Sequence, residues 1–240
     1  MQLKDNFMQL SLARQPINLK QTLVEAHRAK LHGRYGRAII LYQFAQSHAP
    51  DSAEIASRLA PLLAHEGRNF EAWRQFQHAG RALVRENHAE WGLSVFYEAT
   101  RMLPMECDAW RLCASLEKRL GRREHALETL LEGRRQFRSP LHRDQAMSLL
   151  ELARKIEPWA PDIVTDLAGL LSQSGQHERA QHMLEVLLER CPEDEMSRVL
   201  ATRSRITWAP THLWSWAENH LRELMRPRAT RLRERFGSSH

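Results

Sequence analysis

The sequence predicts an all-α protein, an α-solenoid of about six antiparallel helix pairs with a capping helix at each end. Three observations predict it. The commonest residues favour helices, a 34-residue pattern of small and large apolar residues recurs, and a second pattern recurs with a longer period. Periods of this kind are typical of arrays in which each helical unit packs only on its neighbours.

The composition predicts helices. Of the 240 residues, 42% are hydrophobic and 27% are charged, so the chain has enough apolar material to form a core and is not expected to be disordered. Ala, Leu, Arg, Glu and Gln dominate, Pro and Gly number only 10 each, and runs rich in Val, Ile and Thr are missing. These are the preferences of helices and not of strands.

A 34-residue pattern links the first two predicted helix pairs. It separates Gly33 from Gly67, and it also separates Ala38 from Ala72. In a helical hairpin the Gly ends the first helix in a left-handed conformation, and the Ala lets two helices approach to about 8 to 10 Å. A third copy keeps the same internal spacings at Leu167, Ala168, Leu171, Gly175, Ala180, Leu184 and Pro192.

A 54-residue step includes the middle of the chain in the repeat. It separates Gly67, Gly121 and Gly175 from one another. Three further sets show the same step: Ala60, Ala114 and Ala168; Ala72, Ala126 and Ala180; and Pro104 and Pro158. Three helices with their turns span this longer step, as two span the shorter one, so both steps follow if all helices are alike. A true three-helix unit, as in armadillo-like arrays, also explains the longer step, and the sequence leaves both open.

The two periods predict twelve helices. They are expected at 19–32, 35–48, 53–66, 69–86, 88–103, 107–120, 123–137, 142–156, 161–174, 177–190, 195–207 and 211–225. Residues 1–14 add a capping helix, because Leu3, Phe7 and Leu10 share one face before Pro16. Pro61 lies inside the helix expected over 53–66, where a proline costs about 3 kcal/mol. We therefore expect that helix to be kinked or to begin later.

The 34-residue pattern resembles the tetratricopeptide repeat, whose unit carries small and large apolar residues in its first helix and then Gly, Ala and Pro at set positions. Residues 19–52 match best, 53–86 lack the terminal Pro, and 161–194 have Leu187 in place of a small residue. The resemblance implies a right-handed superhelix that binds other proteins. The expected parts are an N-terminal cap at 1–18, repeats at 19–194, C-terminal capping helices at 195–226 and a basic tail at 227–240.

The resemblance also implies where a partner would bind. The concave wall of such an array is made by the first helices, with inward residues at steps 2, 5, 9 and 12 of each repeat. The candidate residues for a peptide groove on this basis are Lys20, Leu23, His27, Lys30, Ser57, Thr165 and Ser172. No first helix has Asn at the step where some of these proteins grip a C-terminal carboxylate, so a chaperone tail is not the expected ligand.

The net charge of +6 lies at the C-terminal end. Residues 198–240 contain nine arginines and three acids, whereas residues 1–197 contain 26 basic and 26 acidic residues. Two interpretations remain, a solvated cap with a frayed tail or a surface that docks an acidic protein segment, a membrane face or nucleic acid. The candidate residues of this basic end are Arg222, Arg226, Arg228, Arg231 and Arg235.

The residues that could carry chemistry lack the spacing for it. His177 and His182 are five apart, whereas a zinc protease helix needs its two histidines four apart on one face. Cys107 and Cys113 fit a small buried apolar role better than a nucleophilic one. The seven tryptophans are expected mainly to fill the core or the caps, with a binding platform as the alternative. No phosphate-binding loop or nucleophile elbow occurs, so we expect no catalytic residues, no metal and no cofactor.

These observations favour a protein-interaction scaffold or adaptor over an enzyme. The expected partner is another protein or a peptide held in the groove, with an acidic partner or anionic surface possible at the C-terminal end. A helical-repeat nucleic-acid binder and a self-associating structural element are the alternatives, and the neutral body argues against the first. With no leader, no transmembrane run and three cysteines outside any paired motif, a cytoplasmic protein is expected. Thirty arginines against five lysines indicate GC-rich codon usage and hence a bacterial origin.

Overall fold

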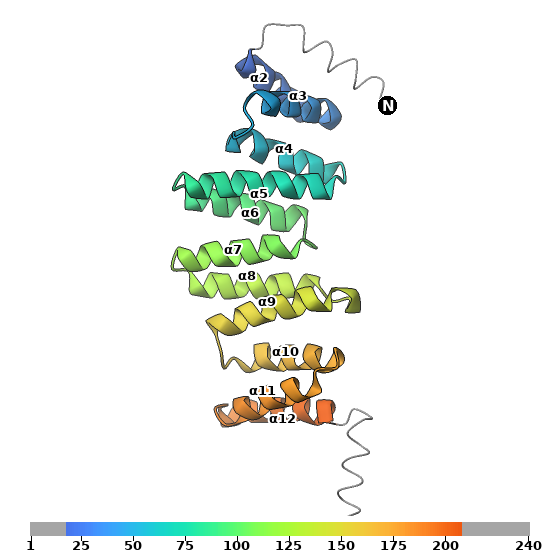
Figure 1. The fold of residues 1–240 in the computed structure, drawn as a ribbon, viewed down its shortest axis with the longest axis vertical. Coiled ribbons are helices and arrows are strands. Elements are labelled where there is room, and N and C mark those ends of the chain that lie inside the picture. The colour runs from blue at the N-terminus through green and yellow to red at the C-terminus, as the bar shows by residue number, and fades with distance from the viewer. Residues whose placement is uncertain (1–17, 208–240) are drawn as a thin grey trace, which may run out of the picture. The chain divides into compact units, whose positions relative to one another are not determined.

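The computed structural model describes residues 18–207, in which every regular element is a helix (Figure 1). The elements are α2 (Leu19–Leu31), α3 (Tyr35–His48), α4 (Ala53–His65), α5 (Asn69–Arg85), α6 (Ala89–Met102), α7 (Cys107–Arg119), α8 (Arg123–Gln136), the short 3-10 helix η1 (Pro140–His142), α9 (Arg143–Ile156), α10 (Pro161–Gln173), α11 (His177–Leu188) and α12 (Glu193–Thr207). The predicted helices between 19 and 207 are confirmed, with closely similar ends. The predicted helices at 1–14 and 211–225 lie outside the described residues.

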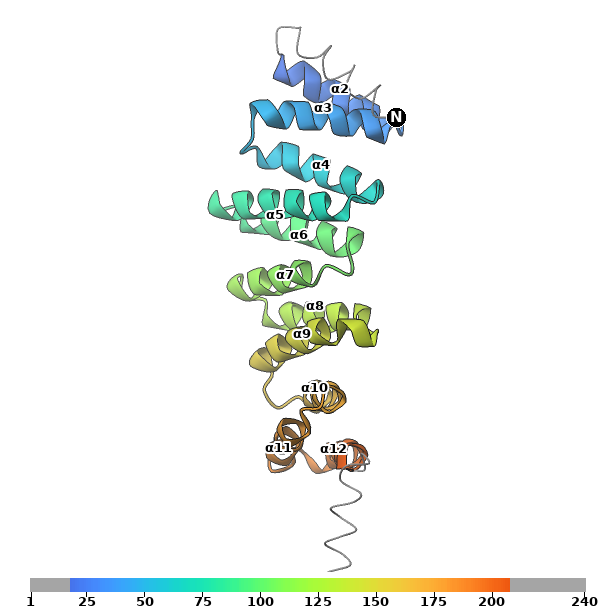
Figure 2. The ribbon, with the colours of Figure 1, turned by 45° about the vertical axis from the view of Figure 1, so that its right-hand side comes forward.

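The described helices fall into two compact units, and the chain divides between Ile156 and Glu157. In the first unit α2 to α9 follow one another in chain order, each packed against the next (Figure 1). The second unit contains α10, α11 and α12, each of which contacts the other two (Figure 2).

Five tight turns share one hydrogen-bonding pattern. At the α4–α5 turn, Gly67 has φ +74°, its amide donates to the Ala64 carbonyl at 3.0 Å, and the Arg68 amide donates to the Leu63 carbonyl at 2.9 Å. This is the Schellman ending of a helix, which needs a left-handed residue. Equivalent turns follow α2, α5, α7 and α10, and Asn87 takes the left-handed place after α5 with φ 66°.

The left-handed glycine turns show both sequence periods. Gly33 and Gly67 follow α2 and α4 at the 34-residue step, and Gly67, Gly121 and Gly175 follow α4, α7 and α10 at the 54-residue step. Within each of the longer steps the first helix also contacts the third, so that α4 touches α6, α7 touches α9 and α10 touches α12. Both periods found in the sequence are therefore present in the turns of the structure.

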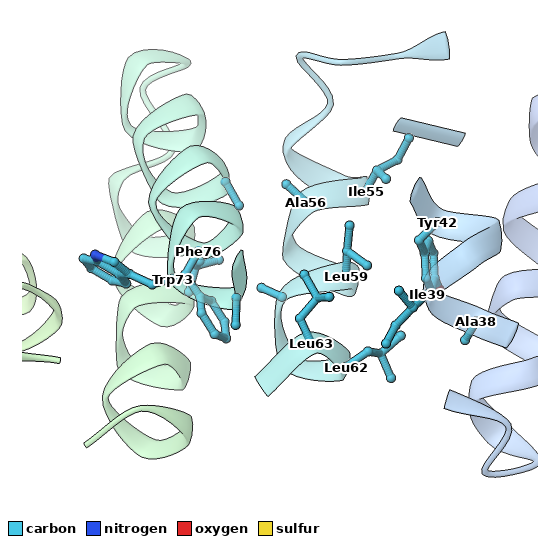
Figure 3. Close-up of a cluster of buried hydrophobic side chains, with 14 of the residues drawn as sticks. Ala38, Ile39, Tyr42, Ile55, Ala56, Leu59, Leu62, Leu63, Trp73 and Phe76 are labelled. Carbon is cyan, nitrogen blue, oxygen red and sulfur yellow. The ribbon is translucent and has the colours of Figure 1, made fainter. Parts of the chain in front are cut away.

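The core of the first unit is built from alternating small and large side chains. Figure 3 shows leucines of α4 between side chains of α3 and α5. Leu59 and Leu63 are fully buried there, and a buried leucine stabilises the fold by about 1.5 to 3 kcal/mol. The buried residues labelled in the figure are Ala38, Ile39, Tyr42, Ile55, Ala56, Leu59, Leu62, Leu63, Trp73 and Phe76.

Pro61 does not delay the start of its helix. The helix begins at Ala53, where the Ser52 hydroxyl accepts a hydrogen bond from the Ile55 amide at 3.3 Å, so the expected later start is wrong. The physical reason is burial. Leu59, Leu62 and Leu63 flank the proline and are all buried, and together they outweigh the roughly 3 kcal/mol that an internal proline costs.

The tryptophans divide into two kinds. Trp73 and Trp110 are buried as expected, and the Trp110 indole N–H donates to the Pro104 carbonyl at 3.0 Å. Trp91 is 70% exposed, so the expectation of a core role is wrong for it. Trp159 is 44% exposed and lies under the Arg190 guanidinium, 4.3 Å from the ring centre. Trp208, Trp214 and Trp216 lie outside the described residues.

Candidate functional site

Three of the predicted groove residues come together between α2 and α4. They line a pocket of about 450 Å³ with side chains of the next helix hairpin. The full lining is Lys20, Leu23, Val24, His27, Glu54 and Arg58. Lys20 and Glu54 occupy the same step of consecutive repeats, as do Val24 and Arg58, so equivalent positions of two first helices form the walls.

Charge in the α2–α4 pocket is largely compensated. Arg58 and Glu54 form an ion pair at 2.7 Å along one face of α4. Behind them, burial raises the pKa of the Tyr42 phenol, and the positive charge of Arg58 lowers it in part. Lys20 and His27 are exposed, and Leu23 packs against the core below. The pocket therefore offers a small apolar surface with few free charges.

The other groove candidates lie elsewhere. Lys30 is partly buried on α2 and does not line the pocket. The Ser57 hydroxyl donates to the Glu54 carbonyl at 2.9 Å, and the Thr165 hydroxyl donates to the Pro161 carbonyl at 2.7 Å. Ser172 shares a 3.0 Å hydrogen bond with His177 Nδ1. Thr165 and Ser172 belong to the second unit, and the basic-end arginines, from Arg222 to Arg235, lie outside the described residues.

A larger pocket of about 620 Å³ lies on α5, α6 and α7, and its charge is not compensated. Four arginines surround it, three from α5 and one from α7, and no acidic residue lines it. The lining is Arg74, Gln77, His78, Arg81, Val84, Arg85, Phe96, Leu112, Ser115, Leu116 and Arg119. The side chains of α5 recur every third or fourth position, which places them on one face of the helix.

The floor of the α5–α7 pocket depends on two glycines at the α5–α6 contact. A Cβ atom on Gly80 would lie 2.4 Å from Cζ of Phe96, and one on Gly92 would lie 2.7 Å from Cγ2 of Val84. The two helices can therefore pack closely enough for the Phe96 ring to lie beneath α5. Phe96 and Leu116 belong to one buried cluster, against which Val84 and Leu112 pack.

Two of the three cysteines, Cys107 and Cys113, are unsuited to nucleophilic chemistry. Burial raises the pKa of the Cys107 thiol to about 11 and also raises the pKa of Cys113, which is fully buried. A cysteine reacts as its thiolate, so both side chains act as small apolar groups. Within residues 18–207 no three His, Cys, Asp or Glu side chains come together in a way that could hold a metal ion.

Sequence reasoning missed the α5–α7 pocket. The repeat resemblance directs attention to the first helices, whereas most of this lining comes from α5, the second helix of its pair. One signal was present, because Arg74, Arg81 and Arg85 follow one another at steps of seven and four along a predicted helix. Arg119 belongs to a later helix, and only the packing of α7 brings it to the same pocket.

The fold defines this chain as a helical-repeat protein. The sequence profile described as Tetratricopeptide repeat matches residues 142–206, the stretch from the end of η1 through α12. The resemblance predicted from the sequence is thereby confirmed, and the match covers one part of the chain.

Several solved structures resemble the chain at low sequence identity. A tetratricopeptide repeat protein of Thermus thermophilus, TTC0263, is 21% identical, covers 79% of this chain and 97% of its own, and has a TM-score of 0.25. PilF of Pseudomonas aeruginosa is 14% identical over 92% of this chain and 93% of its own, with a TM-score of 0.26. YrrB, described as having an unusual peptide-binding site, is 13% identical over 76% of this chain and 90% of its own, with a TM-score of 0.26. No curated protein matches the sequence.

The helices that the structure describes are too short or too polar to cross a membrane. None of those between residues 18 and 207 is both long and apolar enough to do so.

Proposed function

We propose that this chain is a non-catalytic scaffold that binds a segment of a partner protein on the surface of its first helices. The observation that carries the proposal is the α2–α4 pocket, where Lys20 and Glu54, which occupy the same position of consecutive repeats, line one hollow. Helical-repeat arrays use surfaces of this kind, shared between successive units, to bind extended or helical peptides.

The chemistry of the pocket indicates a ligand selected mainly by shape. Its one close ion pair joins Glu54 to Arg58, and Val24 is an exposed apolar side chain beside it. A partner segment that inserts an apolar side chain next to Val24 and places a polar group near Lys20 would suit this surface. Nucleic-acid binding and self-association remain the alternatives from the sequence, and a basic docking end and a cytoplasmic location remain predictions from it.

A peptide selection tests the proposal. Peptides selected from a random displayed library on the full chain should bind it with micromolar affinity, and Lys20→Glu should weaken them at least fivefold. Arg28→Glu is the matched control, because Arg28 is exposed on the same helix, outside the pocket, and the charge change is the same. If Lys20→Glu and Arg28→Glu bind the selected peptides equally well, the partner does not bind at the α2–α4 pocket. Failure to select any peptide would count against the scaffold function.

A further inference from the structure

We propose that the α5–α7 pocket is a second docking surface, which binds an acidic, amphipathic segment of a partner protein. An apolar side chain of that segment would enter above the Phe96 floor, and its carboxylates would pair with the arginines around the rim. This inference goes beyond the scaffold function assigned to α2–α4, because it concerns other residues and stands even if the first pocket binds nothing.

The rim arginines differ from six other arginines of the described chain, which are paired with acids. Ion pairs within 4 Å join Arg58, Arg68, Arg111, Arg122, Arg198 and Arg203 to acidic side chains. Among the described residues Arg81, Arg85 and Arg119 form no ion pair, and Arg74 lies only in the electrostatic field of Glu71, which is itself paired with Arg68. Four guanidinium groups around one pocket repel one another, and a bound anion would relieve that repulsion.

A second observation in the pocket also points to a ligand. His78, which lines the α5–α7 pocket, has its Nε2 atom buried without a hydrogen-bond partner among the described residues. Buried polar atoms are normally paired, so an unpaired ring nitrogen in a pocket wall is a place where a ligand group can bind. A carboxylate or backbone group of the partner segment would supply the missing partner.

The arrangement of the charges sets the pattern of the ligand. Arg85 and Arg119 lie at the C-terminal ends of α5 and α7, with Arg81 one turn before Arg85. Arg74 lies about 10 Å further back along α5, at about 1.5 Å per residue. We therefore expect a cluster of carboxylates at one end of the bound segment, an apolar side chain in the middle and a further acid about two helical turns away.

The chain's own terminal segments do not have this chemistry. Residues 208–240 contain six arginines against three glutamates, and residues 1–17 contain Lys4 and Arg14 against Asp5. Both segments are net positive, so the arginine rim would repel them. The occupant is therefore a separate, acidic chain.

Nucleic acid fits the pocket less well than a protein segment does. Bases bind on exposed aromatic faces, whereas Phe96, the single aromatic ring other than His78 in this lining, is only 3% exposed. A nucleic-acid strand also needs a basic track along its path. In the α2–α4 pocket of the same unit the arginine is paired with Glu54, so the uncompensated rim does not continue there as a basic track.

The experiment uses the full chain and a short fluorescein-labelled helical peptide with leucines on one face and glutamates on the other. The wild type should bind it with micromolar affinity, and the double variant Arg81→Glu with Arg85→Glu should bind at least tenfold more weakly. The charge-matched control is Arg37→Glu with Arg101→Glu, two exposed arginines outside the pocket, which should change binding less than twofold. Thermal unfolding by circular dichroism verifies that both double variants are folded.

Three further measurements decide the interpretation. A polyglutamate peptide of equal charge should bind at least fivefold more weakly, because it has nothing to place over Phe96; equal binding would mean that a general positive field, and not this pocket, is responsible. A single-stranded oligonucleotide of similar length that binds more tightly than the amphipathic peptide would overturn the proposal in favour of nucleic acid. Lys20→Glu should leave the peptide affinity unchanged, which separates this test from that of the α2–α4 surface.

Discussion

The two pockets of the first unit show how one helical array can offer two different surfaces. At α2–α4 an arginine is paired with a glutamate on the same helix, and the remaining lining is small and mixed. At α5–α7 four arginines surround an apolar floor, and no acid lines the pocket. The first surface can select mainly by shape, whereas the second can select by charge as well.

The difference begins with the ends of two equivalent helices. Pro50 follows α3, which ends at His48 after 14 residues. The second repeat lacks that proline, so α5 continues to Arg85 and reaches 17 residues. The added turn carries Val84 and Arg85, which are part of the floor and the rim of the α5–α7 pocket. A missing repeat residue thus enlarges one helix and creates a surface that the first repeat does not have.

The largest expected effect comes from Gly80→Ala, which would disturb the second pocket alone. The new methyl group would lie 2.4 Å from Cζ of the Phe96 ring, so the ring or α5 must move. Overpacking of this kind costs about 1 to 3 kcal/mol. We expect a lower urea midpoint and weaker binding of the acidic peptide, while the α2–α4 pocket keeps its ligand.

The matched control is Gly169→Ala in α10, where a methyl group would meet nothing within 4 Å. Replacing a glycine inside a helix by alanine stabilises it by roughly 0.5 to 1 kcal/mol when there is space. The same substitution should therefore raise the free energy of unfolding at one glycine and lower it at the other. A stabilising Gly80→Ala would show that α5 and α6 do not pack as closely as described.

Tyr97→Phe should have the next largest effect, beneath the second pocket. The Tyr97 hydroxyl donates a hydrogen bond to Glu117, whose side chain is only 1% exposed and whose other carboxylate oxygen has no partner among the described residues. Loss of the hydroxyl leaves a buried carboxylate less well paired, at a cost of about 1 to 3 kcal/mol. Urea unfolding of the wild type and of Tyr97→Phe at pH 7 measures this loss in the free energy of unfolding. Tyr35→Phe, whose hydroxyl makes no hydrogen bond in the described chain, should change stability by less than about 0.5 kcal/mol.

The hydrogen bond between Tyr97 and Glu117 predicts that the stability of the fold depends on pH in the alkaline range. Burial, together with the hydrogen bond to Glu117, raises the pKa of Tyr97 from 10.0 to about 12. The pKa of Tyr97 is higher in the folded state than in the unfolded state, so the protonated phenol stabilises the fold. This contribution of Tyr97 to the free energy of unfolding is complete below pH 10 and is lost as the pH rises through about 12. The stability difference between wild type and Tyr97→Phe should narrow over this window. A difference that stays constant across the same window would contradict the assignment.

The sequence predicts the helices far better than the surfaces. Helix ends depend on local residues such as Ser52 and Gly67, which act through their own turn, and the repeat register alone places Lys20, Leu23 and His27 on one wall. The α5–α7 pocket depends instead on the depth at which Phe96 packs under α5. Depth of packing depends on pairs of residues far apart in sequence, and no local pattern predicts it.

The smallest expected effect concerns the ion pair that compensates the charge of Arg58 in the first pocket. Glu54 is 61% and Arg58 is 43% exposed, and such a surface pair contributes only about 0 to 1 kcal/mol to stability. Glu54→Gln should hardly change the unfolding midpoint, yet it frees Arg58 to pair with a carboxylate of a ligand.

The two surfaces differ chiefly in compensated charge, and Glu54→Gln should reduce that difference. When Arg81→Glu and Arg85→Glu have removed the second site, Glu54→Gln should raise the residual affinity for the acidic peptide by roughly two- to fivefold, because one partly exposed arginine contributes less than about 1.4 kcal/mol, or tenfold. Glu66→Gln changes the net charge equally but lies at the end of α4, outside the pocket. An equal gain from Glu66→Gln would show that total charge, and not the pairing of Arg58, distinguishes the two surfaces.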